Sequence, residues 1–221
     1  VKLPISGLAQ VARGLGFINL TADADGPTRR IPLLARAGTV TVPQIALAVA
    51  QDLAGAKSLT LTENSLRLGD QTVPLASDGT LLLNWHGTLE QTYPQYAIGH
   101  VLQSFTQMEK QERPALDPVK FRDKIVFVAG TAAGLYDLRV TPFSSATPGV
   151  LIHMTALDNL LQNEFLRPVP QWIVRMLLLA FCMASASSPP MSKTAKVKRP
   201  KGPRSESAPP TTSTDASGSS T

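Results

Sequence analysis

A glycine loop is the first of three groups of residues whose types and spacing could support chemistry. In KIVFVAGTAAGLYDLRVTPF, residues 124–143, an apolar run leads into Gly130 and Gly134. A dinucleotide-binding loop needs G-x-G-x-x-G between a strand and a helix, and a P-loop needs G-x-x-x-x-G-K-[ST]. Neither spacing is present, and the segment that follows is rich in proline and turn residues rather than helix formers. The pattern therefore favours a tight loop at the end of a buried strand over a phosphate site.

Two aspartates, Asp23 and Asp25, form the second group. Aspartates at alternate positions before a glycine suggest a calcium loop, but that pattern also needs a third oxygen ligand before the glycine and a distant glutamate. Neither stands at the required spacing. The Asp25-Gly26 pair followed by Pro27 is instead a strong turn signal, so we expect the solvated tip of a hairpin.

The third group comprises the histidines and the single cysteine. His86, His100 and His153 are far apart in sequence, and Cys182 lies in an apolar run, so no zinc-ligand spacing exists. The G-x-S-x-G and HExxH motifs are absent as well. We therefore predict no metal site, no cofactor and no catalytic residue. His153 is the candidate general base if the protein is nevertheless an enzyme.

Strands and helices in mixed order must position these residues. KIVFVAG, residues 124–130, is a continuous apolar run of the kind buried on both faces of a sheet. Helices are predicted at Thr41–Leu53, around the apolar repeat from Ile98 to Phe105, and at His153–Leu166. Thr41 and Gln44 have the spacing of a capping box. The fold class is therefore α/β or α+β, with a mixed sheet whose central buried strand is KIVFVAG, flanked by helices.

The chain divides into three parts by composition. Residues 1–168 have the balance of a folded domain, and residues 169–184 resemble the beginning of a membrane helix. The apolar run in that second part is short, because spanning a bilayer takes about 20 apolar residues. Residues 185–221 are rich in Ser, Pro, Thr and Lys, so we expect a disordered tail. Their six basic and two acidic residues supply +4 of the net charge of +5, so the folded part shows no sign of binding nucleic acid.

Four segments taken together resemble the second class of CHASE domains, the cyclase- and histidine-kinase-associated sensory extracellular domains. The segments, in order, are GFINLTADADGPTRRIPLL, VPQIALAVA, FRDKIVFVAGTAAGLYDLRVTPF and PGVLIHMTALDNLL. The first carries the D-x-D-G signature with basic residues and an apolar-proline pair: Asp23, Asp25, Gly26, Arg29, Arg30 and Pro32. The third carries Asp137 and the Thr141-Pro142 pair. The resemblance covers about residues 4–168.

The resemblance implies an extracytoplasmic sensory domain of a bacterial membrane receptor. Such receptors have one membrane helix before the domain, three after it, and a cytoplasmic cyclase or kinase. We expect this chain to be a receptor fragment without that output domain, located at the cell membrane on its periplasmic side. Its partners would be a small-molecule or periplasmic ligand, the membrane in the full-length receptor, and a second copy of the chain in a homodimer.

The ligand site is predicted from the loop after the expected central strand. In α/β sheets ligands favour the crevice outside the carboxyl ends of the strands. Thr131, Asp137 and Thr141 follow that strand, so we expect them to lie together near its carboxyl end as the ligand-binding residues. Asp137 would either face the ligand or cap backbone N–H groups of its own loop. Two alternatives remain open from the sequence: a small α/β enzyme that uses the Gly130 loop and His153, and an interaction protein that acts through its basic tail.

Overall fold

The computed structural model describes residues 6–131, 137–167 and 169–186. The described chain forms two compact units, Val1–Pro170 and Gln171–Thr221. The helices are α1 (Ser6–Val11), α2 (Ile45–Leu53), α3 (Leu89–Thr92), α4 (Ile98–Glu109), the 3-10 helix Pro118–Phe121, α5 (Gly149–Gln162) and α6 (Gln171–Ala186). The strands are β1 (Arg30–Pro32), β2 (Leu34–Ala37), β3 (Val40–Pro43), β4 (Leu59–Leu61), β5 (Ser65–Leu68), β6 (Gln71–Pro74), β7 (Thr80–Leu82), β8 (Leu138–Arg139) and β9 (Thr147–Pro148).

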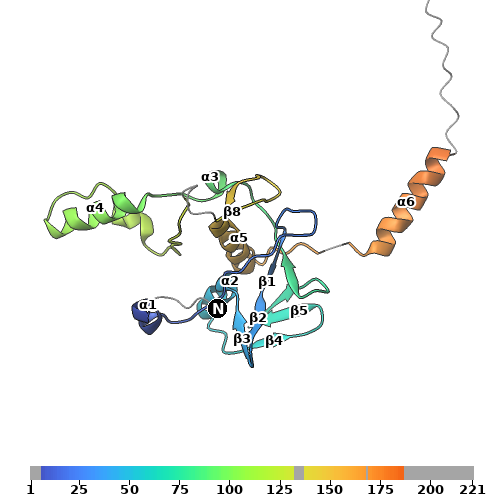
Figure 1. The fold of residues 1–221 in the computed structure, drawn as a ribbon, viewed down its shortest axis with the longest axis horizontal. Helices are drawn as coiled ribbons and strands as arrows, with labels where there is room; N and C mark the ends of the chain where they lie inside the picture. The colour runs from blue at the N-terminus through green and yellow to red at the C-terminus, as the bar shows by residue number, and fades with distance from the viewer. Residues whose placement is uncertain (1–5, 132–136, 168, 187–221) are drawn as a thin grey trace, which may run out of the picture. The chain divides into compact units, whose positions relative to one another are not determined.

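The strands form small antiparallel sheets rather than one large sheet (Figure 1). β1 pairs with β7, β2 with β3, β8 with β9, and β4, β5 and β6 form a three-stranded meander. In the β5–β6 hairpin Leu66 faces Val73, and Gly69 has a φ of 59°. A positive φ at the first turn residue is what a type II′ turn requires, so the predicted Gly69-Asp70 hairpin is confirmed. With its helices, the chain has the predicted mixed α/β class.

The core lies where α2 and α5 pack together beside the sheets (Figure 1). α2 contributes Leu47, α5 contributes Ile152, and both side chains are fully buried. From the strands, Ile31, Leu66 and Leu81 fill the space between them with no measurable exposure. Each fully buried aliphatic side chain of this size stabilises the fold by about 1.5–3 kcal/mol. The core therefore holds α5 rigidly, and α5 carries several of the polar residues discussed below.

The predicted central strand at Lys124–Gly130 is wrong. This segment is irregular, and no described strand pairs with it. Val126 and Val128 are 52% and 80% exposed, whereas Phe127 packs against the core. A strand needs a partner backbone as well as apolar side chains, because each of its N–H and C=O groups must find a hydrogen bond. The apolar run predicted a buried strand, but it could not show that the available strands, such as β1 and β7, pair with each other and not with this segment.

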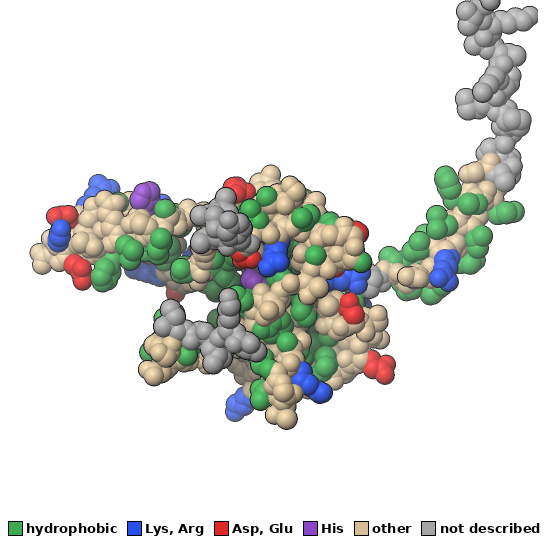
Figure 2. Space-filling model, viewed as in Figure 1, with side chains coloured by type: hydrophobic (Ala, Val, Ile, Leu, Met, Phe, Trp, Pro, Cys, Tyr) green, Lys and Arg blue, Asp and Glu red, His purple; other side chains and the backbone are tan. Residues whose placement is uncertain are grey.

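The predicted helices form, with three differences from expectation. α5 begins and ends four residues before the predicted range His153–Leu166, because Asn163 ends it in the left-handed conformation. α2 begins later than predicted, because Thr41 belongs to β3 and Gln44 is the N-cap residue. α4 has the predicted apolar repeat, yet Leu102 and Phe105 are about 60% exposed, and Figure 2 shows hydrophobic side chains along this helix. Periodicity identifies an amphipathic helix but not the surface that covers its apolar face.

The second unit contains α6. Its exposed side chains are mostly apolar, with Trp172 at 66% and Phe181 at 72%, and Arg175 is its one charged residue (Figure 2). Within the described ranges, no helix combines the length and the hydropathy needed to cross a bilayer. The tail predicted to be disordered falls, apart from its first two residues, outside the described residues, as do the basic residues on which the interaction-protein alternative depends.

Candidate ligand-binding site

The first turn of α5 lies against a carboxylate from the β8–β9 hairpin. α5 follows Pro148, whose side chain makes no capping hydrogen bond, and the Gly149 N–H donates to the backbone oxygen of Asp137 at 2.8 Å. A Cβ atom at position 149 would lie 2.6 Å from both carboxylate oxygens of Asp137. The carboxylate therefore occupies the space that glycine leaves open, and the positive end of the helix dipole stabilises its charge.

Asp137 also has a cationic neighbour. The Nε atom of Arg139 lies 3.5 Å from Asp137 Oδ1, and the two side chains are 44% and 52% exposed. An ion pair this exposed contributes little to stability, because water and salt screen it. Asp137 thus presents a carboxylate that is oriented by the helix terminus and still accessible from solvent.

His153 lies one turn further along α5 and is almost completely buried. Its Nδ1 atom is 2.6 Å from the Nε2 atom of Gln44, the fully buried N-cap residue of α2. Because the Oε1 atom of Gln44 accepts a hydrogen bond from the Ala46 N–H, the amide must donate through Nε2. His153 Nδ1 is therefore the acceptor, and the ring is neutral with its proton on Nε2. The Gln44–His153 hydrogen bond joins the start of α2 to the first turns of α5.

The stability of the folded chain is expected to fall as the pH drops below about 6.5, in part because of His153. Burial lowers the pKa of His153 below its usual value of 6.5; nearby Asp137 opposes this shift and Arg139 adds to it. As the pH falls, the histidine of the unfolded chain binds a proton first, so the unfolded state is favoured. Chemical denaturation at a series of pH values measures how steeply the free energy of unfolding changes with pH.

Two histidine variants isolate this contribution. His153→Gln removes the buried titrating group and should flatten the slope of the free energy of unfolding below pH 6.5. His100→Gln is the matched control, because His100 is exposed on α4 and should leave the slope unchanged. An unchanged slope in His153→Gln would show that the ring is not held neutral by its surroundings.

The three residues predicted to form the site differ in burial and in their hydrogen bonds. Asp137 and Thr141 lie on the β8–β9 hairpin, but Thr141 is buried and its hydroxyl is 2.9 Å from that of Thr147. Thr131 is exposed, and among the described residues no hydrogen bond connects it to the other two. Gly134 and the rest of 132–136 lie outside the described residues. Asp137 is thus the member whose side chain is both oriented and accessible.

Gln44 is a structural residue of this region that the sequence did not identify. The capping-box spacing predicts that the Gln44 side chain bonds the backbone N–H of Thr41, whereas in the structure Gln44 is itself the N-cap residue of α2. Its actual position is close to Gly16, whose missing Cβ lets Phe17 pair with Gln44 in a parallel bridge. A glutamine directly before a helix that is apolar on all sides was the available signal, because a buried amide needs partners.

A second polar region lies beside the hairpin. The tip of residues 21–29 approaches it, and the buried Thr28 N–H donates to the Val140 oxygen at 2.8 Å. Between this tip, β1 and the turn before β7 lies a cleft of about 620 Å³. The residues that line it are Thr21, Ala22, Asp23, Ala24, Asp25, Arg29, Arg30, Pro32, Asp78 and Thr80. Its volume is in the range of small-molecule sites.

Ion pairs order the tip on one side of the cleft. Arg29 donates to Asp25 at 2.7 Å and to Asp23 at 3.4 Å. The hydrogen bond from Arg29 is the main reason that the pKa of Asp25 is lowered from its usual value. Within the described chain no group of three or more His, Cys, Asp or Glu side chains is arranged to hold a metal ion. These aspartates bind an arginine of their own loop. The predicted hairpin around this loop is wrong, because Phe17 pairs with Gln44 and β1 pairs with β7.

Comparison with known proteins identifies one relationship. A family model described as CHASE2 domain matches residues 4–187. No curated protein and no solved structure matches the chain. The matched range includes Asp137, His153 and the whole cleft.

Proposed function

The chain belongs to the CHASE2 domain family, a family of sensory extracellular domains, and from this membership we propose that it is the extracytoplasmic ligand-sensing domain of a bacterial membrane receptor. The observation that carries the proposal is the family match, which covers residues 4–187 and so includes every element of the α2–α5 core. In this proposal the domain lies on the periplasmic side of the cell membrane, and its partners are a small ligand, the membrane and a second copy of the chain.

The geometry around His153 supports sensing over catalysis. A general base must lie within hydrogen-bond reach of a nucleophile or a substrate proton. His153 instead accepts a hydrogen bond from the Gln44 amide and is buried. The enzyme alternative also relied on the Gly130 loop, and Gly130 does not follow a strand. Neither His153 nor the Gly130 loop therefore supports the enzyme alternative.

The proposed ligand surface is the part of the domain where the β8–β9 hairpin meets the tip of residues 21–29. Asp137 and Thr131 are its proposed contacts from the loop after Gly130, because both are exposed. Thr141 supports the hairpin from inside through Thr147. The Thr28–Val140 hydrogen bond joins this hairpin to the loop that lines the cleft, so the hairpin and the cleft are neighbours in the proposed surface.

A thermal-shift screen of the full chain tests the proposal. A ligand at a hundred times its Kd stabilises the folded state by about 2.7 kcal/mol, which gives a clear rise in melting temperature. The screen should include amino acids, sugars, organic acids and metal salts, with each compound recovered afterwards. Stabilisation without chemical change supports a sensor, whereas conversion of a recovered compound would favour the enzyme.

We propose further that α6 inserts into the membrane in the full-length receptor. Its sequence from Met176 to Ala184 is uncharged, and the helix exposes Leu177, Leu178 and Leu179 at about 60% each. Between Arg175 and Ser185 the apolar side chains surround the helix, which suits lipid better than one face of a folded core.

The full chain is therefore expected to float with phospholipid vesicles in a density gradient. The double change Leu177→Glu with Leu178→Glu should abolish flotation, because a charged residue in the centre of an inserted helix costs about 2.5–3.5 kcal/mol. Gln171→Glu, at the polar end of the same helix, is the control and should float. Equal flotation of all three proteins would contradict the proposed insertion.

A further inference from the structure

Arg30, at the start of β1, is a cation in the cleft whose Nε atom finds no hydrogen-bond acceptor among the described residues. Its Nε atom is buried and makes no hydrogen bond, and no carboxylate of the described chain lies within ion-pair distance of its guanidinium. The adjacent Arg29 differs, because Asp23 and Asp25 both bind it. Asp78 interacts with Arg30 through its charge but makes no hydrogen bond to it. A buried donor without a hydrogen-bond acceptor is costly, so the site is suited to a ligand that supplies the acceptor.

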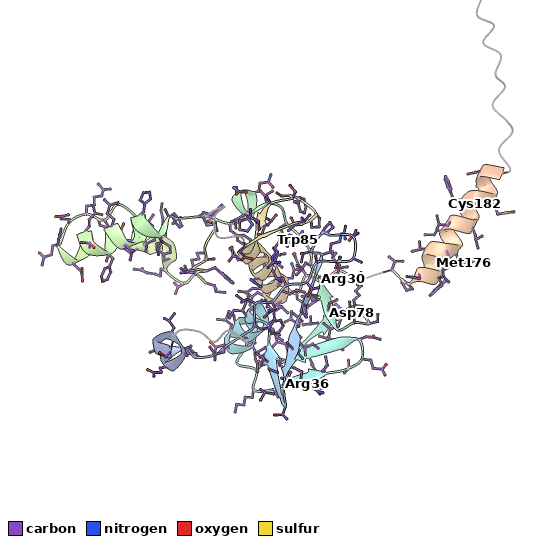
Figure 3. All side chains as sticks on the ribbon, in the orientation of Figure 1. Arg30, Arg36, Asp78, Trp85, Met176 and Cys182 are labelled. Carbon is purple, nitrogen blue, oxygen red and sulfur yellow. The ribbon has the colours of Figure 1, made fainter. Side chains whose placement is uncertain are left out.

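Asp78 provides an opposite charge near Arg30 in the cleft. Figure 3 shows the two labelled residues close together, and both line the cleft. One carboxylate oxygen of Asp78 accepts from the N–H and the hydroxyl of Thr80, at 3.0 and 2.6 Å. The other oxygen accepts no hydrogen bond from the described residues. It is therefore available to a donor on a ligand.

The balance of charge restricts the class of ligand. The cleft contains two arginines and three aspartates, Asp23, Asp25 and Asp78, so its net charge is one negative. A simple anion would be repelled by the carboxylates, and a simple cation would leave Arg30 without a partner. A molecule that carries both a carboxylate and an ammonium group satisfies Arg30 and an aspartate together.

We propose that this cleft binds a free amino acid, whose carboxylate pairs with Arg30 and whose ammonium group pairs with Asp78. The proposal rests on the sensory function above and names its ligand class. A cleft of about 620 Å³ is large enough for an amino acid together with bound water. The Thr28–Val140 hydrogen bond connects the cleft to the hairpin of Asp137.

Thermal shift and calorimetry on the full chain test the proposal with the standard L-amino acids as probes, one at a time. At least one should raise the melting temperature of the wild-type protein. Its α-amide, which lacks the carboxylate, and its N-acetyl form, which lacks the ammonium group, should not. This comparison uses only the wild-type protein, so it holds even if a variant fails to fold.

Substitution of Arg30 gives the second test. Arg30→Gln should weaken binding of the active amino acid about tenfold or more, the effect of losing a charge-assisted hydrogen bond. Arg36→Gln is the matched control, because Arg36 is exposed on β2 and does not line the cleft (Figure 3). Equal affinity in wild type and Arg30→Gln would overturn the proposal.

The outcomes also separate this inference from the sensory function. If glucose, succinate or calcium stabilises the wild-type protein and no amino acid does, the sensor remains and the amino-acid site is rejected. If the amide or the N-acetyl form binds as well as the amino acid, the pairing with Arg30 and Asp78 is rejected. If no compound stabilises the chain, both proposals fail.

Discussion

Replacement of Asn159 by alanine is expected to lower the free energy of unfolding by about 2–4 kcal/mol. Asn159 is fully buried on α5, and its side chain acts as both acceptor and donor to one backbone. Its Oδ1 atom accepts from the Asn84 N–H at 2.8 Å, and its Nδ2 atom donates to the Asn84 oxygen at 3.0 Å. Alanine would leave both backbone groups of Asn84 without these partners.

Chemical denaturation of Asn159→Ala beside Gln162→Ala measures this effect. Gln162 is exposed at the end of the same helix, so its replacement should change the free energy of unfolding by no more than about 0.5 kcal/mol. Asn159→Asp places a buried carboxylate oxygen against the Asn84 oxygen, so at neutral pH it should be at least as destabilising as Asn159→Ala. If Asn159→Ala were as stable as the control, the segment after β7 would not be held to α5 by this amide.

Gly16→Val is expected to destabilise the domain by about 3 kcal/mol, near the upper end of the usual effect of overpacking. A Cβ atom at position 16 would lie 2.5 Å from the Cα and 2.7 Å from the N of Ile45. Those atoms are backbone at the start of α2, so they cannot rotate away. The bridge that brings Phe17 against Gln44 would have to open, and the partner of His153 would move with it.

Gly14→Val is the control for this substitution. A Cβ atom at position 14 meets no other atom within 4 Å, and the residue is exposed. Its replacement should therefore be nearly neutral, and the difference between the two valine variants isolates the close approach at Ile45. Equal melting temperatures for both would show that the chain around Gly16 does not pack against α2.

Much of the secondary structure could be predicted because it depends on local sequence. The β5–β6 hairpin follows from alternating apolar residues around Gly69-Asp70, and α4 and α5 follow from apolar repeats at helical spacing. The central strand could not be predicted in the same way. Its apolar side chains are a local feature, whereas the partner strand it would need is chosen by the whole chain.

The residues of the candidate site also differ in whether local sequence could identify them. Asp137 and the Asp23–Arg29 tip were identified from motifs in which the residues are close in sequence. The Gln44–His153 pair was not, because 109 positions separate its members. The sequence also could not show that Arg29 and Arg30 differ in their hydrogen bonds. Only the structure shows that Asp23 and Asp25 bind Arg29 and that neither binds Arg30.

The sequence alone determined the family, the α/β class and the turn chemistry of the hairpins. These depend on residue types at short, fixed spacing, where propensity and periodicity act directly. Only the tertiary structure decided which apolar segments are covered, that Thr141 faces inward while Asp137 faces the α5 terminus, and that Arg30 Nε finds no hydrogen-bond acceptor among the described residues. Burial and pairing depend on residues far apart along the chain, and their free energies arise only when the fold brings those residues together.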